Sequence, residues 1–149
     1  RRFAGEFIGR KLKLCYEPLN VSCVTDEKWL LFVIEQVLSN ALKYTRAGSI
    51  TIELEAPKTL VIRDTGIGVA PEDLPRIFEK GYTGYNGRGD QKASGLGLYL
   101  CRTICKRLGH TITPPPSPTT ALPSASRWSS SRCGSENSIA GTAVRRYRR

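Results

Sequence analysis

A long amphipathic helix is predicted between residues 26 and 45, where apolar residues recur every three or four positions. Thr25 or Asp26 stands where a helix N-cap is preferred, just before the apolar series begins. The apolar series comprises Leu30, Val33, Ile34, Val37, Leu38, Ala41 and Leu42. This stretch therefore supplies one helix with a face to bury.

The apolar spacing changes to two after this helix, which is the period of a half-buried strand. Residues 49–55 and 59–63 are predicted to form paired strands joined by a turn at residues 57–58. Two shorter strand-like stretches precede the helix, at residues 11–16 and 21–24, with turn-forming residues between them.

Glycine, proline and aspartate become frequent in residues 64–94, which predicts loops around one short helix at residues 71–78. A further helix is predicted at residues 95–108, because Gly109 stands where helices end. Residues 110–113 then begin another strand. Helices on one side of a mostly antiparallel sheet make an α+β fold, a two-layer sandwich.

The character of the chain changes abruptly after residue 113. Five prolines crowd into residues 114–123, serines follow, and the last five residues include four arginines. This composition lacks the periodicity that a core element needs. We therefore expect one domain at residues 1–113 and an atypical Pro/Ser/Arg-rich tail at residues 114–149 that stays outside its core.

The net charge of +10 does not indicate nucleic-acid binding. Residues 112–149 carry six Lys/Arg against one Asp/Glu, so half of the excess lies near the C-terminus, and no basic stripe interleaved with aromatic residues precedes it. The five cysteines form an odd, irregularly spaced set, typical of reduced thiols in a cytosol. No run of eighteen apolar residues and no signal-type stretch occurs. We therefore expect a cytoplasmic domain with no nucleic-acid partner.

Gln36, Asn40, Lys43 and Tyr44 are spaced so that they form one stripe along the long helix. Taken alone, such a stripe is more typical of a solvated helix face. A polar ligand bound along the helix is the alternative.

Asp64 ends a predicted strand and is followed by Gly66, Ile67 and Gly68. A carboxylate at this place can accept a hydrogen bond from an amine, and the glycines let a ligand approach the backbone. The other interpretation is a glycine turn in which Asp64 bonds its own backbone.

The sequence Gly95-Leu96-Gly97-Leu98 begins the last predicted helix. Free N–H groups and the helix dipole favour a phosphate at such a start. A glycine turn without a ligand is the alternative. No Gly-x-x-x-x-Gly-Lys-Ser/Thr sequence is present, which excludes a P-loop nucleotide site.

Taken together and in this order, these segments resemble the four boxes of histidine kinase catalytic domains. Residues 35–44 resemble the N box, residues 64–68 the G1 box, residues 76–80 the F box and residues 95–98 the G2 box. The resemblance covers residues 5–113. Among the members of the Bergerat-fold (GHKL) superfamily, which include gyrase-type and MutL-type ATPases, the chain resembles the histidine kinases. It implies a Bergerat fold that binds ATP with Mg²⁺.

The resemblance implies a role for each matching residue. Asn40 is expected to bind Mg²⁺, Lys43 to neutralise phosphate charge and Asp64 to select adenine. The catalytic set implied in this way is Gln36, Asn40, Lys43 and Arg88. The other residues implied at the nucleotide are Tyr44, Gly66, Ile67, Gly68, Lys80, Gly95, Leu96, Gly97 and Leu98.

Two positions depart from the family pattern, and one segment narrows the resemblance. Gln36 stands where the family more often has Asn or Glu, and Ala93 stands where many members have the first Gly of the G2 box. Residues 81–88 resemble the lid of sensor kinases that work beside peptide-antibiotic exporters in Gram-positive bacteria.

The function implied by the resemblance is that of a two-component sensor histidine kinase, in which this domain transfers the ATP γ-phosphate to a histidine on a separate dimerisation domain. Expected partners are that phosphoacceptor domain of the same full-length protein and a response regulator, with membrane contact only through N-terminal regions outside this chain. His110, the only histidine, lacks the acidic neighbour of a phosphoacceptor box. Two alternatives stay open, a GHKL-type ATPase and a non-catalytic nucleotide-binding regulatory module.

The tail lacks the closing Gly-Thr strand that the resemblance leads us to expect. Read one frame over, the codons of residues 120–128 permit the sequence Gly-Thr-Ala-Val-Arg-Leu-Pro-Val, which has the pattern of that strand. We hypothesise that residues 114–149 are a frameshift product. If the tail is genuinely part of the protein, we expect one edge of the sheet to lose its partner strand and adenine to lose a contact with a Thr.

Overall fold

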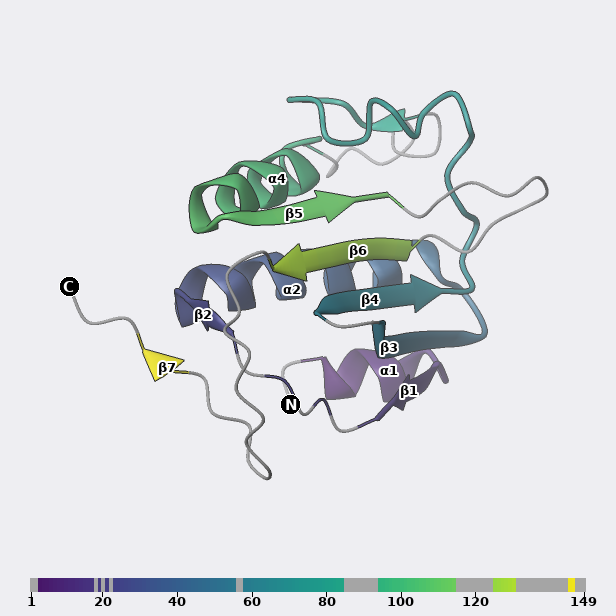
Figure 1. The fold of residues 1–149 in the computed structure, drawn as a ribbon. Helices are drawn as coiled ribbons and strands as arrows, with labels where there is room; N and C mark the ends of the chain where they lie inside the picture. The colour runs from purple at the N-terminus through teal and green to yellow at the C-terminus, as the bar shows by residue number, and fades with distance from the viewer. Residues whose placement is uncertain are drawn as a thin grey trace.

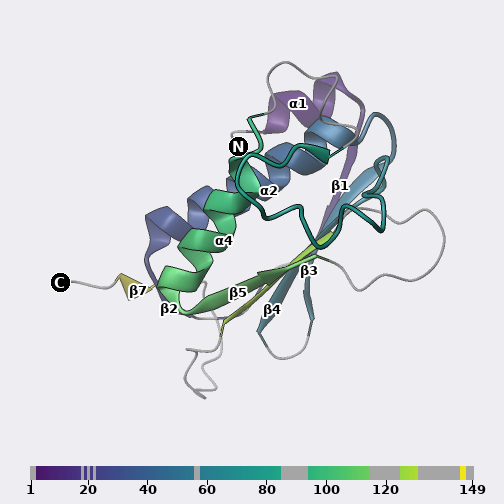
Figure 2. The same cartoon turned by 90° about the horizontal axis from the view of Figure 1, so that it is seen from above.

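The computed structural model describes residues 3–17, 19, 21, 23–55, 58–84, 94–114, 125–130 and 145–146. Its elements are α1 (Ala4–Gly9), β1 (Lys13–Tyr16), β2 (Val24–Thr25), α2 (Glu27–Tyr44), β3 (Ser49–Glu55), β4 (Thr59–Asp64), α4 (Gly97–Leu108), β5 (His110–Thr113), β6 (Ala125–Ser130) and β7 (Arg145–Arg146). Figures 1 and 2 show α1, α2 and α4 on one face of a sheet. This arrangement confirms the expected α+β two-layer fold.

The main sheet has five strands in the order β1-β3-β4-β6-β5. β3 and β4 form an antiparallel pair, β6 is antiparallel to both β4 and β5, and β1 alone in this sheet is parallel to its neighbour β3. A mostly antiparallel sheet is therefore confirmed. The short strands β2 and β7 form a separate parallel pair.

β6 corrects one expectation about the tail. Its backbone lies between β4 and β5, with Ala125 opposite Arg63 on one side and Arg127 opposite Thr113 on the other. The expectations that residues beyond 113 stay out of the domain and that the sheet lacks a partner here are wrong for residues 125–130. Strand pairing satisfies backbone groups of any sequence, so an apolar period is not required for it.

The long helix begins and the last helix ends where the sequence predicts, whereas α4 begins at Gly97, two residues after the expected start. Asp26 caps α2, because its Oδ1 accepts hydrogen bonds from the backbone N–H groups of Lys28 at 3.0 Å and Trp29 at 3.2 Å. α4 ends at Gly109, whose φ of 75° is the left-handed conformation that glycine adopts most easily.

The helix expected at residues 71–78 is absent, and this expectation was wrong. The segment is a series of turns, held by bonds such as Arg76 N–H to Asp73 O at 2.9 Å and Glu79 N–H to Arg76 O at 2.8 Å. Pro75 has no N–H to donate one turn back, so a regular α-helix cannot run through this stretch.

The core lies between the helices and one face of the sheet. Among the described residues, α2 contributes Val33 and Val37, α4 contributes Cys101 and Cys105, and Ile62 contributes from β4. The short helix α1, which no sequence pattern predicted, adds a buried Phe7 to the same cluster. No described helix combines the length and the apolar character that crossing a membrane requires.

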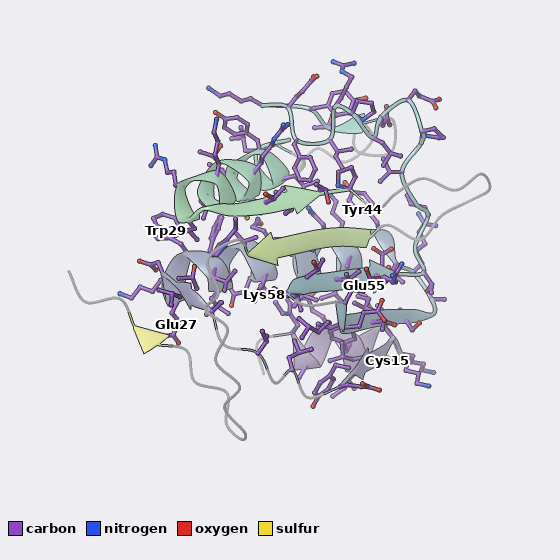
Figure 3. All side chains as sticks on the ribbon, in the orientation of Figure 1. Cys15, Glu27, Trp29, Tyr44, Glu55 and Lys58 are labelled. Atoms are coloured by element: carbon purple, nitrogen blue, oxygen red, sulfur yellow. The ribbon has the colours of Figure 1, made fainter. Side chains whose placement is uncertain are left out.

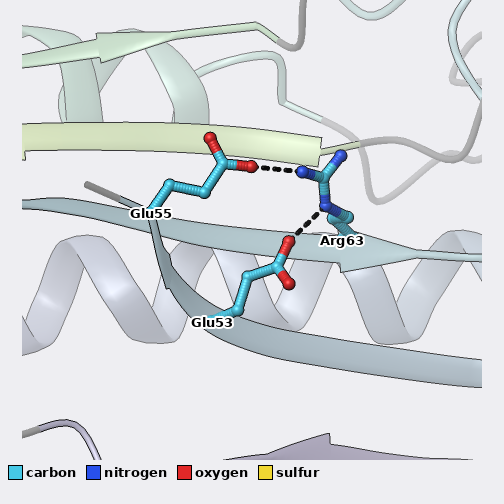
Figure 4. Close-up of polar contacts among 3 residues, drawn as sticks. All are labelled: Glu53, Glu55 and Arg63. Atoms are coloured by element: carbon cyan, nitrogen blue, oxygen red, sulfur yellow. Dashed lines mark hydrogen bonds and ion pairs between the residues drawn. The ribbon is translucent and has the colours of Figure 1, made fainter.

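The other face of the sheet carries a cross-strand ion pair. Arg63 on β4 contacts both Glu53, at 2.5 Å, and Glu55 on β3 (Figure 4). The hydrogen bond to Glu53 raises the pKa of the Arg63 guanidinium above its ordinary value. Val61, which pairs with Glu53 on this face, is fully buried, so the outer face also carries a buried apolar residue.

Candidate functional site

The polar stripe predicted on the long helix lies on α2. Its four side chains, Gln36, Asn40, Lys43 and Tyr44, are each half-buried. Half-burial is not what a fully solvated helix face shows, so the stripe borders other parts of the molecule. Figure 3 shows Tyr44 at the end of α2 toward which β4 runs, and Trp29 marks the opposite end.

Asp64 is bound to the C-terminal end of α2 through a set of contacts that we call the Asp64 cluster, comprising Tyr44, Thr45, Asp64, Gly66 and Ile67. The Thr45 hydroxyl donates to Asp64 Oδ1 at 3.3 Å, and the Gly66 N–H donates to the same oxygen at 2.9 Å. The Ile67 N–H donates to the carbonyl of Tyr44 at 3.2 Å. Asp64 is 3% exposed and Thr45 is 0% exposed, so this carboxylate is held inside the protein.

Gly66 is required by the tightness of the Asp64 cluster. A Cβ at this position would lie 2.5 Å from Tyr44 O, 2.7 Å from Asp64 Oδ1 and 2.9 Å from Thr45 Oγ1. No side chain fits there without moving backbone, which explains the glycine two residues after Asp64.

The turn that begins α4 contacts the other end of the stripe. A Cβ on Gly97 would lie 3.5 Å from Gln36 Nε2, so the Gln36 amide lies against the first turn of α4. The N-cap of α4, Leu96, makes no side-chain cap hydrogen bond. The backbone N–H groups of this turn therefore keep the anion-binding character of a helix start.

These two contacts place two turns along α2. Thr45, bonded to Asp64, and Gln36, next to Gly97, are nine residues apart, or about 13 Å along a helix. Asn40 lies between them on the same helix. The turn after β4 and the turn before α4 therefore contact α2 on either side of Asn40.

A second set of contacts, the Tyr82 cluster, joins the turns of residues 71–84 and comprises Asp73, Arg76, Glu79 and Tyr82. The Tyr82 hydroxyl donates to Asp73 Oδ1, and the Arg76 guanidinium lies 4.4 Å from the centre of the Tyr82 ring. Arg76 Nε also donates to Glu79 Oε2 at 3.1 Å. The cluster joins residues 73–79 to Tyr82, near the start of the segment that the sequence predicts to be a lid.

Gly95 links that segment to the start of α4. Its φ is 66°, its carbonyl accepts the Gly81 N–H at 3.1 Å, and a Cβ there would lie 2.4 Å from the Gly81 carbonyl carbon. Two glycines in backbone contact thus bring residue 81 next to the turn before α4.

The remaining predicted residues divide into three groups. Lys43 is half-buried with its Nζ 5.0 Å from the Tyr44 ring centre, and Lys80 is exposed. Arg88 lies outside the described residues. The others lie in the two glycine turns: Ile67, which is 58% exposed, Gly68, with a φ of 73°, Leu96, which is exposed, and Leu98, which packs on the core.

Sequence reasoning missed Thr45 and the Tyr82 cluster. Thr45 directly follows the polar stripe and precedes a basic residue, so its type and place were visible, but nothing in the sequence links it to Asp64 nineteen positions on. Asp73 and Tyr82 were likewise visible as residue types, but the loop between them hides their pairing.

Cys101 and Cys105 are buried core residues of α4. Burial raises the pKa of the Cys101 thiol to about 12 and that of Cys105 to about 11. His110 is also buried, with its Nε2 2.9 Å from Thr25 Oγ1. No group of three or more His, Cys, Asp or Glu residues that can hold a metal occurs in the described part of the chain.

The chemistry available here is recognition of a ligand with an amine at one end and an anion at the other. A buried carboxylate at Asp64 accepts hydrogen bonds, and the start of α4 offers N–H groups and a positive dipole end. The amide of Asn40 and the ammonium of Lys43 lie along the helix between these ends. Amide oxygen is a ligand type that Mg²⁺ accepts beside phosphate.

Residues 25–139 match the family described as histidine kinase-, DNA gyrase B-, and HSP90-like ATPase. The chain is 41% identical over 112 residues to the sensor histidine kinase YxdK of Bacillus subtilis, which covers 69% of this chain and 34% of YxdK. It is 46% identical over 88 residues to the sensor protein BceS of Halalkalibacterium halodurans, covering 57% of this chain and 26% of BceS. The chain thus spans about a third or less of these curated relatives.

Solved structures of sensor kinases have the same fold. The mycobacterial sensor histidine kinase MprB aligns with a TM-score of 0.64 at 20% identity, over 83% of this chain and 86% of that one. The Acinetobacter baumannii histidine kinase AdeS aligns with a TM-score of 0.59 at 26% identity, over 87% of this chain and 59% of that one.

Proposed function

Since this chain belongs to the family of histidine kinase-, DNA gyrase B- and HSP90-like ATPases, we propose that it binds Mg-ATP as the catalytic domain of a two-component sensor histidine kinase. Two of its curated relatives are named a sensor histidine kinase (YxdK) and a sensor protein (BceS), which supports this member of the family over a gyrase-type enzyme. The donor of the phosphoryl group is ATP and the acceptor is a histidine on a separate domain.

The Asp64 cluster is the observation that carries the proposal. Asp64 is a buried carboxylate whose Oδ1 takes two protein donors, from Thr45 and Gly66. A buried acceptor held in one orientation is suited to read the exocyclic amine of adenine, because a base that presents an oxygen there leaves it unmatched.

The phosphates would lie toward the start of α4. The N–H groups of Gly97 and Leu98 suit an anion, while Lys43 supplies positive charge from α2. The carboxamide oxygen of Asn40 would hold Mg²⁺ together with the phosphates, and Gln36 lies close enough to the α4 turn to orient it. Lys80 and Arg88 would add charge from the lid side.

Bound Mg-ATP supplies the electrophilic γ-phosphoryl group, and the chain's own work is to position and neutralise it. His110 is unsuited to accept the phosphoryl group, because it is buried against Thr25. The acceptor histidine therefore belongs to a dimerisation domain of the longer protein, whose curated relatives are about three times the length matched here. A response regulator would then receive the phosphoryl group. The sequence of residues 81–88 favours a sensor kinase of the peptide-antibiotic type.

The proposed function also implies a cellular location for the chain. It would be the cytoplasmic domain of a membrane-bound sensor.

The strand between β4 and β5 bears on the frameshift hypothesis. The residues whose shifted reading frame permits the expected strand sequence, 120–128, overlap the residues that form this strand, 125–130. This overlap supports a frameshift at residues 114–149. Resequencing the gene tests it, and an intact frame that encodes the printed residues would reject it.

Calorimetric titration with Mg-ATP and Mg-ADP tests the binding step, with Asp64→Asn as the control. We expect saturable binding by the wild type, and at least about a hundredfold weaker binding by the variant, because the amide presents a donor where an acceptor is needed. Equal binding by both proteins would contradict the role of Asp64.

Adding the cognate dimerisation domain in trans tests the transfer step. A phosphohistidine that forms on the added domain only when this chain and Mg-ATP are present supports the kinase. Hydrolysis of ATP without any histidine-bearing partner favours a GHKL-type ATPase instead. Binding without either reaction favours a regulatory module.

A further inference from the structure

Thr45 is a fully buried hydroxyl at the junction of α2 and the predicted base site. Its backbone ends α2, with its N–H donating to the Ala41 carbonyl at 3.0 Å and with a φ of −103° and a ψ of 109° that leave the helix. Its exposure is 0%. A hydroxyl at such a place is costly to bury unless it is hydrogen-bonded.

The hydroxyl donates to the same carboxylate oxygen that the Gly66 N–H contacts. The donor-to-acceptor distances are 3.3 Å from Thr45 Oγ1 and 2.9 Å from Gly66 N to Asp64 Oδ1. Two donors on one oxygen fix the rotation of the carboxyl group. If the Thr45 hydroxyl is removed, the Gly66 N–H is the one of these two donors that still contacts Asp64 Oδ1.

The same hydroxyl packs against the place where Gly66 lacks a side chain. A Cβ on Gly66 would approach Thr45 Oγ1 to 2.9 Å. Thr45, Asp64 and Gly66 therefore pack against one another. This packing constrains the size of residue 45, and the hydrogen bond to Asp64 requires its hydroxyl.

We propose that Thr45 is a specificity-determining positioning residue, whose hydroxyl holds the Asp64 carboxylate so that it distinguishes a purine with an exocyclic amine from one with a carbonyl oxygen. This inference rests on the proposed nucleotide-binding function. Thr45 does not contact the base. It acts through Asp64, by holding the carboxyl group in the rotation that directs an acceptor oxygen at the amine.

The test compares binding of Mg-ATP with binding of Mg-ITP, in which the amine is replaced by oxygen. The variants are Thr45→Val, which keeps the shape and removes the donor, and Thr45→Ser, which keeps the donor. Thr103→Val is the matched control, because it removes a threonine hydroxyl that donates to the Tyr99 carbonyl at 3.0 Å within α4. Melting temperatures of all variants are measured without nucleotide.

We expect the wild type, Thr45→Ser and Thr103→Val to favour ATP over ITP by similar factors. Thr45→Val should lower this preference by about tenfold, which is the size of one hydrogen bond to a charged group. If Thr45→Val does not fold, Thr45→Cys, with a weaker donor of similar size, should lower the preference part of the way.

Two outcomes overturn the inference and leave the proposed function in place. In one, folded Thr45→Val keeps the wild-type preference. In the other, it binds both nucleotides more weakly by the same factor, which indicates a structural role alone. A wild type that binds neither nucleotide overturns the proposed function itself, together with this inference.

Discussion

The Asp64 cluster and the Tyr82 cluster lie in loops that follow one another in the chain, yet they are built differently. The Asp64 cluster consists of buried groups bonded to the end of a long helix, with Thr45 0% and Asp64 3% exposed. In the Tyr82 cluster, the side chains of Arg76 and Glu79 are 54% and 52% exposed, and their contacts join turns to turns.

The contrast indicates which part of the site is set before a ligand arrives. Hydrogen bonds excluded from water hold one geometry, whereas ion pairs open to solvent contribute little and are easily exchanged. We therefore expect the base-reading end to be preformed and the lid end to adjust. Segments with few buried contacts are those that open and close around ligands.

The largest effect should come from Gly66→Ala. The added Cβ would meet backbone at Tyr44 O and the Asp64 carboxylate, so we expect a loss of about 2–3 kcal/mol in the free energy of unfolding. Mg-ATP binding should fall by at least about a hundredfold. Urea unfolding and calorimetry measure the two quantities.

The control for Gly66→Ala is Gly9→Ala, where nothing lies within 4 Å of the new Cβ. It should change the free energy of unfolding by less than about 1 kcal/mol. If Gly66→Ala has the stability and the Mg-ATP affinity of the wild type, the Asp64 cluster is not rigid.

Gly95→Ala should have an intermediate effect. Its φ of 66° and the 2.4 Å approach to Gly81 disfavour any side chain, so we expect about tenfold weaker Mg-ATP binding. The loss in unfolding free energy should be about 1–2 kcal/mol, less than for Gly66→Ala, because the lid end can shift. Gly5→Ala, where nothing lies within 4 Å of the new Cβ, is the control, and an equal effect of the two variants would contradict the importance of the Gly81 contact.

Tyr82→Phe should have a smaller effect. It removes the hydroxyl that donates to Asp73 and keeps the ring under Arg76, so we expect about threefold weaker binding of Mg-ATP. The melting temperature should stay close to that of Tyr16→Phe, an exposed tyrosine on β1. A tenfold or greater loss would mean that the lid end is as rigid as the base end.

The smallest effect should be that of thiol-alkylating reagents on the two buried cysteines of α4 near neutral pH. Their pKa values are raised from 9.0 to about 12 for Cys101 and about 11 for Cys105, so both are neutral there and should resist alkylation while Cys15 reacts. The unfolded chain releases these protons more readily, so stability should be constant up to about pH 9 and fall as the pH rises toward 11 and 12. Fast alkylation of Cys101 at pH 8 would show that opening of the lid end spreads into α4.

The sequence predicted the elements whose signals are local and repeated. α2, β3 and β4 have clear apolar periods, and the caps at Asp26 and Gly109 depend on neighbouring residues alone. The helix expected at residues 71–78 failed because Pro75 outweighs the surrounding helix formers. α1 was too short to produce a period, and β6 has none.

The candidate site divides in the same way. Asp64, Gly66 and Gly97 were visible as motif residues, and the structure places all three next to α2 or its C-cap. The links from Thr45 to Asp64 and from Tyr82 to Asp73 were not visible, because such pairs depend on how separate loops meet in space. The roles of all these residues stay predictions until nucleotide binding is measured.

The position of β6 constrains how the protein is made. On the ribosome, β4 and β5 emerge before the strand that bridges them, so the sheet of a nascent chain ending at residue 113 is in two parts. Closure of the sheet must wait for residues 125–130, and this late, long-range pairing is the slow kind of folding step. A nascent chain paused before that point would present two open strand edges, to which chaperones or other nascent chains can bind.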